Sequence, residues 1–216
     1  QTGKSFESHA FNGCTSLKRI KTVYSVTKGD TQSFKSTIGA GCFKNFISLE
    51  EVCIPSSISE IGYEAFYGCC NLKQVVIPSS VTLIGDCCFY GCKKLSFPSP
   101  KIFDSVQSIG DKSFNECKSL TKITIPSSVR NIGTLAFCNC TSLKEISILS
   151  SSFKLGYNVF NGCISLNQVF FSSLYIVEFR TFMGCESLKE INIPSSVTSI
   201  KNYAFADCYS LTKVSI

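Results

Sequence analysis

The chain has 216 residues, of which 44% are hydrophobic and 17% charged, and its formal net charge is +6. This composition excludes intrinsic disorder, and no apolar run is long enough to span a membrane. The charge is not gathered into a dense basic stripe in the sequence, so we expect no nucleic-acid partner. The start lacks the apolar core of a signal peptide, so we expect either an intracellular protein or a mature or excised piece of a longer one. The absence of an initial Met favours the piece.

One pattern recurs along the whole chain: a Phe is followed three residues later by Cys, and three residues after that by Leu. The spacing is 23 residues in five of eight steps, and the exceptions are 32, 25 and 22 residues. Nine periods in register indicate a repeat protein, in which stacked units bury apolar surface that each unit alone exposes. The Phe column consists of Phe11, Phe43, Phe66, Phe89, Phe114, Phe137, Phe160, Phe182 and Phe205.

One unit, residues 119–141, reads SLTKITIPSSVRNIGTLAFCNCT and divides into four stretches. The alternating, β-branched stretch LTKITI predicts a short strand, and the PSS after it predicts a turn. VRNIG is expected to run back along the other face, and TLAFCNC has a spacing that suits a single helical turn. Strands of successive units are expected to pair in parallel, about 4.8 Å apart.

The stretch IPSSVTLIG at 77–85 returns in closely similar form at 54–62, 125–133 and 193–201. Together with the Phe, Cys and Leu columns it gives the pattern L-x-x-I-x-I-P-S-S-V-x-x-I-G-x-x-A-F-x-x-C-x-S over residues 5–216. This pattern resembles the BspA-like leucine-rich repeat family, and its cysteine and IPSS resemble the protist members. The resemblance implies an α/β, β-rich fold: a right-handed leucine-rich-repeat solenoid of about nine coils with a parallel sheet on its concave side. It also implies a surface protein, several members being linked to adhesion.

The repeat is irregular in places, but we expect one solenoid domain over 1–216 because the columns continue throughout. An insertion at about 21–35 is expected to protrude as a basic loop. At about 96–103, Pro98 and Pro100 fall where other coils have strand residues, so the sheet is expected to be weak there.

Two further irregularities lie toward the end of the chain. The coil after Cys163 is one residue shorter than the others, and Glu178 replaces its usual Gly. The last residues form a strand that no cap follows, so Ile216 is expected to leave an open edge. We expect the array to continue there or to associate end to end with another molecule.

Eight of the fourteen cysteines stand in one column. Phe46 takes that place in one coil, so the position is apolar and we expect a buried ladder of free thiols. Disulfides between coils are disfavoured because the side chains run parallel. The column consists of Cys14, Cys69, Cys92, Cys117, Cys140, Cys163, Cys185 and Cys208.

The other cysteines divide into two groups by their place in the repeat. Cys42 and Cys88 share a column with alanines and are expected to be buried. The rest are expected at the surface, which favours a reducing or oxygen-poor setting. This surface group consists of Cys53, Cys70, Cys87 and Cys138.

The sequence offers no catalytic or metal-binding constellation. His9 is the only histidine, so Ser and Cys lack a base, and adjacent Glu50 and Glu51 in a strand point to opposite faces. No glycine-rich phosphate loop and no convergent metal ligands occur. We expect a protein that is not an enzyme and that needs no cofactor or metal. The sequon Asn139-Cys140-Thr141 is interpreted as a chance match because Cys140 belongs to the buried column.

Solenoids bind partners on their strand face, and strand alternation predicts which side chains point outward there. Phe170 is the best candidate for an anchor, because aromatic residues dominate interface energetics. The first-coil insertion, with Lys21, Tyr24 and Lys28, is a second candidate. The predicted binding residues are Glu51, Gln74, Val76, Lys122, Thr124, Glu145, Gln168, Phe170, Glu190 and Asn192, with Cys53, Ser147, Lys213 and Ser215 on the same face.

The leading hypothesis is a non-enzymatic protein-binding module of a surface protein, extracellular in location. Its partner would be host matrix or a protein of a neighbouring cell, and its role adhesion. The alternative is a cytoplasmic scaffold that docks a regulatory protein such as a phosphatase, which the free thiols and the missing signal peptide favour. A third hypothesis is a spacer that holds another domain away from a surface.

Overall fold

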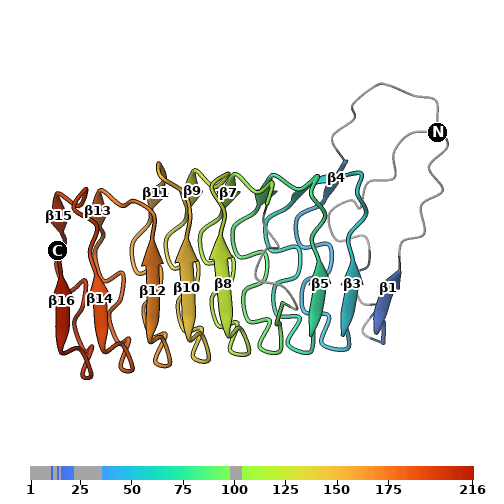
Figure 1. Ribbon diagram of the computed structural model, residues 1–216. Helices are drawn as coiled ribbons and strands as arrows, with labels where there is room; N and C mark the ends of the chain where they lie inside the picture. The colour runs from blue at the N-terminus through green and yellow to red at the C-terminus, as the bar shows by residue number, and fades with distance from the viewer. Residues whose placement is uncertain (1–10, 12–13, 15, 22–35, 98–103) are drawn as a thin grey trace.

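The computed structural model describes residues 11, 14, 16–21, 36–97 and 104–216. Over these residues the chain is a stack of coils that contains sixteen short strands and no helix. Each coil contributes strands to two rows that run along the stack, which we name the lower row and the upper row from their places in Figure 1. The expected parallel-sheet solenoid is therefore confirmed.

The lower row forms where each coil carries its alternating, β-branched stretch, such as KITI at 122–125. Its strands pair in parallel, and each residue lies beside the equivalent residue of the next repeat. Lys122 thus lies beside Glu145, and Glu145 beside Gln168. The row divides into sheets β1-β3-β5, β8-β10-β12 and β14-β16. Its strands are β1 (Arg19–Lys21), β3 (Glu51–Cys53), β5 (Gln74–Val76), β8 (Lys122–Ile125), β10 (Glu145–Ile148), β12 (Gln168–Phe171), β14 (Glu190–Asn192) and β16 (Lys213–Ser215).

The upper row follows the turn after each lower strand. Six of its strands form one parallel sheet in the order β2-β4-β6-β7-β9-β11, and β13 pairs separately with β15. The row consists of β2 (Ser36–Ile38), β4 (Ile58–Ile61), β6 (Leu83–Ile84), β7 (Ser108–Ile109), β9 (Asn131–Ile132), β11 (Lys154–Leu155), β13 (Ile176–Val177) and β15 (Ser199–Ile200).

A third set of bonds, which we name the turn ladder, joins the coils through the segment around each column Phe. The backbone N–H groups of Leu135, Phe137 and Asn139 donate to carbonyls of the next coil at 2.8–3.0 Å. Leu135 and Asn139 have φ values of 60° and 58°, in the left-handed region. The single helical turn expected for TLAFCNC is therefore wrong, because two left-handed residues turn the backbone groups toward the next coil rather than along the segment.

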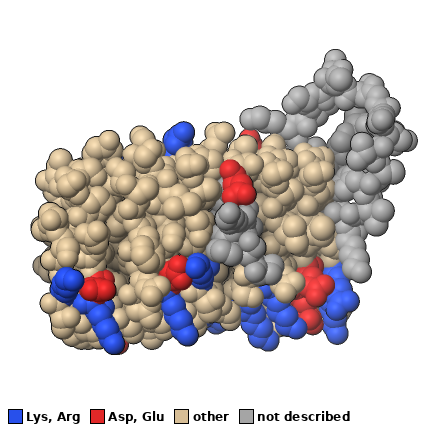
Figure 2. All heavy atoms as spheres, viewed as in Figure 1, with Lys and Arg blue, Asp and Glu red and all other residues tan. Residues whose placement is uncertain are grey.

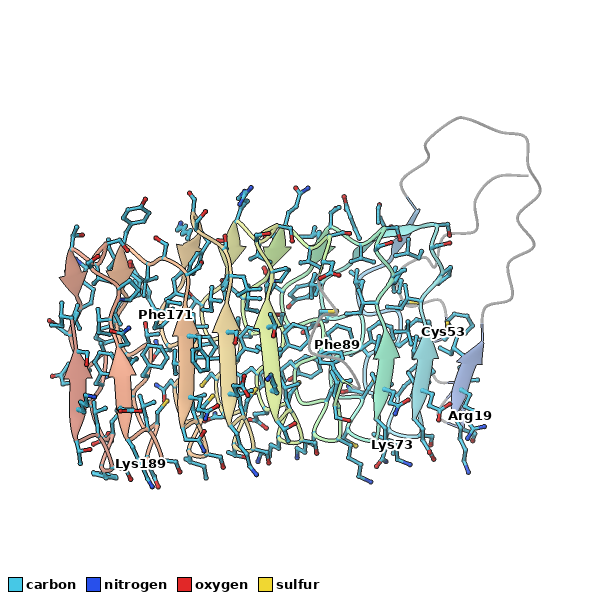
Figure 3. All side chains as sticks on the ribbon, viewed as in Figure 1. Arg19, Cys53, Lys73, Phe89, Phe171 and Lys189 are labelled. Atoms are coloured by element: carbon cyan, nitrogen blue, oxygen red, sulfur yellow. The ribbon has the colours of Figure 1, made fainter. Side chains whose placement is uncertain are left out.

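The core lies between the rows and the turn ladder and is built from the sequence columns. Column Phe rings stack on one another with centroids 5.2–5.8 Å apart and planes within 18° of parallel. From Phe43 to Phe182 these rings are buried, and Phe89 lies among them in Figure 3. Phe46 is buried against Phe43, as its place in the Cys column predicted.

All fourteen cysteines are free thiols. The column from Cys69 to Cys185 is buried as expected, and so are Cys42 and Cys88. Three expectations are wrong. Cys14 is exposed and Cys208 is half-buried, although both belong to the column expected to be buried, and Cys138 is 6% exposed rather than at the surface.

The other three cysteines predicted at the surface differ in exposure, and the two predicted insertions fall largely outside the described residues. Cys53 is exposed, while Cys70 and Cys87 are half-buried. Burial, as the main cause, and the charge of Glu116, as the second, raise the pKa of the Cys138 thiol to about 11. Of the predicted insertions, residues 22–35 and 98–103 lie outside the described residues.

Candidate binding surface

The outward side of the lower row, which we name the strand face, carries the predicted binding residues. The strands alternate between buried and solvent-facing side chains, as in β3 and β5. Most predicted residues are exposed, whereas Thr124, Glu145, Ser147 and Ser215 are half-buried. The structure therefore brings the predicted residues onto one surface, where parallel pairing places equivalent positions side by side.

Charges on the strand face are paired across neighbouring strands. Lys122 Nζ lies 2.6 Å from Glu145 Oε1, and Arg19 Nε lies 3.5 Å from Glu51 Oε2. A third pair joins Lys213 Nζ to Glu190 Oε2 at 3.9 Å. Exposed pairs of this kind contribute about 0–1 kcal/mol each to stability. Their main effect is to leave the strand face with little net charge.

Two apolar side chains interrupt this polar face. Val76 is 59% exposed and Phe170 is 54% exposed. Val76 lies beside Cys53, and Phe170 lies beside Ser147. The two residues belong to separate sheets, so they are separate points rather than one apolar patch.

Phe170 lines a hollow of about 570 Å³ on the strand face. The hollow opens between β12 and β14, which are not paired with each other. Figure 1 shows the wider spacing between these two strands. Its polar groups include the side-chain amides of Gln168 and Asn192 and the ion pair of Glu190 with Lys213. The remaining lining residues are Asn167, Val169, Ile191 and Ser215.

The same junction between coils is also open on the upper row. There β11 and β13 are unpaired, and a hollow of about 510 Å³ is lined by residues including Arg130, Phe153 and Tyr175. The turn ladder continues across the junction, since Phe160 N–H donates to the Thr181 carbonyl at 2.9 Å. We name this junction, between the coils of Phe160 and Phe182, the seam.

The upper row opens at the seam, where the glycine column ends. A Cβ built on Gly156 would lie 2.4 Å from the Thr134 nitrogen, so only glycine permits this close approach. Glu178 and then Lys201 take the next places in the column and carry a Cβ, and β13 still pairs with β15 beside Lys201, so the Cβ is not by itself sufficient to open the row. The coil of Glu178 is also one residue shorter, so it has to lie differently against the coil before it. The sequence shows both irregularities, but their effect on strand pairing was missed because it depends on backbone contacts.

Other predicted features lie outside this surface or outside the described residues. His9 and the insertion residues Tyr24 and Lys28 are not among the described residues, and Lys21 ends β1. Asn139 of the sequon is exposed, and Cys140 is buried. Within the described part of the chain, no cluster of His, Cys, Asp and Glu side chains has the arrangement of a metal site. No described helix has the length and apolarity needed to cross a membrane.

Comparison with solved structures finds leucine-rich repeat proteins. A T. pallidum leucine-rich repeat protein is 29% identical and has a TM-score of 0.60, over 70% of this chain and 71% of that one. A leucine-rich repeat protein from Eubacterium ventriosum is 21% identical and has a TM-score of 0.53, over 83% of this chain and 70% of that one. This second likeness, at its lower identity, shows the fold alone.

A third solved structure, a leucine-rich cell surface protein from Faecalibacterium prausnitzii, is 21% identical, with a TM-score of 0.47 over 93% of this chain and 88% of that one. A TM-score at that level carries no argument about function. Comparison with curated proteins finds no match. The family model for the BspA type leucine-rich repeat region matches residues 1–96 and 94–212, in six copies. The chain thus belongs to the BspA-type leucine-rich repeat family.

Proposed function

We propose that the chain is a non-enzymatic protein-binding module of a cell-surface protein, and that it acts in adhesion to host matrix or to neighbouring cells. The observation that carries the binding role is the exposed ring of Phe170 at the hollow between β12 and β14. An aromatic side chain beside a partly enclosed, polar-rimmed hollow has the composition of an interface anchor.

The geometry favours a macromolecular partner over a small molecule. The hollow lies open on a sheet, and small ligands usually need a cleft that encloses most of their surface. The amides of Gln168 and Asn192 and the charges of Glu190 and Lys213 surround the apolar contact. A partner that covered Phe170 would therefore find hydrogen-bonding groups and both signs of charge at the rim.

The surface location is supported by the resemblance of the repeats to a family of surface proteins. A cytoplasmic scaffold is the second candidate, and the exposed Cys53 side chain, which forms no disulfide, is the observation that favours it. Antibody staining of cells that make the natural protein separates the two locations. Staining of intact cells supports the surface protein, whereas staining only after permeabilisation supports the scaffold.

The strand-face interface is tested with Phe170→Ala and a matched control, Tyr175→Ala. Tyr175 is an aromatic residue of similar exposure, 57%, directly before β13 of the upper row. The probe is a basement-membrane extract that has been stripped of glycosaminoglycans and immobilised on a sensor surface. Phe170→Ala should weaken binding by about 2 kcal/mol or more, roughly thirtyfold, while Tyr175→Ala leaves it unchanged. Equal binding by both variants and the unaltered protein would remove Phe170 as the anchor.

A further inference from the structure

Basic side chains gather along one long edge of the stack, below the lower row. This lower edge consists, in each coil, of the six residues from the Cys-column position to the second residue after the column Leu. Figure 2 shows the blue side chains along it, and Figure 3 shows Lys73 and Lys189 projecting there. It holds ten basic and five acidic residues, a net charge of +5 compared with +6 for the whole chain.

The imbalance is greatest in four consecutive coils, between Lys73 and Glu145. Here six exposed lysines face a single carboxylate of the edge, that of Glu145. Lys122 pairs with that carboxylate, and Lys73 pairs with Glu50 of the coil before. The other four have no ion pair within the described residues. We name them the lysine row: Lys93, Lys94, Lys118 and Lys144.

The stacking of coils brings the lysine row together in space. Adjacent coils lie about 4.8 Å apart, so the row and its neighbour Lys73 span roughly 15 Å. Like charges at this spacing repel one another, and an anion laid along the edge would relieve that repulsion. The row is not apparent in the sequence, because Lys94, Lys118 and Lys144 lie more than twenty residues apart along the chain.

We propose that the lysine row binds a linear sulfated polysaccharide of the glycosaminoglycan class. A narrow line of point charges fits a linear polyanion, and clustered basic residues are a recurring feature of heparin-binding patches. The physiological setting of this proposal rests on the extracellular location given under Proposed function. The binding itself is a property of the lower edge and is independent of Phe170.

Two features of the edge argue against other polyanions. Single-stranded nucleic acids stack bases on exposed aromatic rings, but Phe97 beside the row is half-buried and packs edge-on against Phe114 at 6.1 Å. Membrane surfaces favour basic residues beside exposed large apolar ones. Within the coils of the row the neighbours Asn71, Ser119 and Thr141 are small and polar, and the exposed aliphatic residues of the edge, Ile47 and Ile164, lie in the coils on either side.

The test compares two variants of equal charge, each with four basic residues changed to Gln. One carries Lys93→Gln, Lys94→Gln, Lys118→Gln and Lys144→Gln. The control changes exposed residues outside the lower edge: Lys112→Gln, Arg130→Gln, Lys154→Gln and Lys201→Gln. Affinity for fluorescent heparin fragments is measured by anisotropy at several salt concentrations. Thermal unfolding verifies that both variants are folded, as expected for exposed sites.

The lysine-row variant should lose at least about tenfold in affinity, and the slope of log K against log salt should become shallower by about three to four. The control variant and Phe170→Ala should keep the affinity of the unaltered protein. Equal losses in both quadruple variants would overturn the proposal, since only net charge would then matter. Equal binding of desulfated heparin, or tighter binding of single-stranded RNA or anionic phosphatidylserine vesicles, would also overturn it.

Discussion

The Sγ atom of Cys140 donates a hydrogen bond to the carbonyl oxygen of Phe114, one coil earlier and 3.2 Å away. The same carbonyl accepts the backbone N–H of Cys117 at 3.2 Å. Equivalent thiol bonds recur at the other coil junctions from Cys69 to Cys208. Cysteine suits this column because its body is small and apolar and its S–H supplies a second donor to a buried carbonyl.

Replacing Cys140 with alanine should lower the free energy of unfolding by about 1–2 kcal/mol. The variant loses both the buried sulfur and its hydrogen bond to Phe114. Urea titration followed by circular dichroism measures the change. Cys14→Ala is the matched control, because Cys14 is exposed and should change stability by less than about 0.5 kcal/mol. Similar effects in both variants would contradict a structural role for the thiol ladder.

Phe137→Ala should cost about 3–5 kcal/mol of stability. Its ring is buried and stacks on Phe114 and Phe160, so truncation leaves a cavity that the rigid coils cannot close. Phe170→Ala removes a ring that is largely exposed and should cost far less. Chemical denaturation of the two variants provides the comparison, and a near-neutral Phe137→Ala would refute the stacked-ring core.

Gly133→Ala should cost at least about 2 kcal/mol. An added Cβ would lie 2.5 Å from the Asp111 nitrogen and 2.6 Å from the Gly110 carbon. Both are backbone atoms, so relief requires the coils to separate. Glu178→Ala, at the column position that already has a Cβ, serves as the control and should leave the unfolding midpoint nearly unchanged. If both substitutions were tolerated, close backbone approach could not explain the glycine column.

The protein should lose stability as the pH rises above about 9. Burial raises the pKa of Cys69 from the usual 9.0 to about 12, and burial likewise raises the pKa of Cys92 and Cys163 well above that value. Between pH 9 and 12 the unfolded chain therefore releases thiol protons that the folded chain retains. Each such thiol costs up to about 1.4 kcal/mol for each pH unit in this window.

Urea titrations at pH 8 and pH 10 measure this loss. Cys69→Ala, though less stable at pH 8, should show a smaller difference between the two pH values, because it lacks one of the titrating thiols. An unchanged difference in this variant would show that other groups govern the alkaline loss.

The repeat columns were sufficient to predict the core and the strand face. Phe137, Cys140 and Ile123 occupy the buried positions that their columns indicate. The turn ladder could not be predicted in this way. Lys112 and Leu135 adopt left-handed backbone conformations that intrinsic preferences reserve largely for Gly, Asn and Asp. Hydrogen bonds between coils hold them there, and those bonds exist only once the coils are stacked.

The repeat pattern also could not predict features that depend on a single position, such as the burial of Cys138. Cys138 follows a buried Phe and lies in a column of mixed residues, so its burial depends on the local packing of its own coil. The sequence shows Glu178 and the short coil, but the pairs of strands that separate, β11 from β13 and β12 from β14, are seen only in the structure. The binding role of Phe170 and of its neighbours on the strand face remains a prediction.

The seam is the weakest junction of the stack when the protein is pulled along its long axis. In a solenoid each coil touches only its neighbours, so tension along the long axis passes through every junction in series. At the seam both strand rows are interrupted. The tension is therefore borne by the turn ladder, by the thiol bond of Cys185 to the Phe160 carbonyl and by ring contacts such as that of Phe160 with Phe182. A protein pulled along this axis should therefore part first between these two coils, where the hollow beside Phe170 would widen before any other region opens.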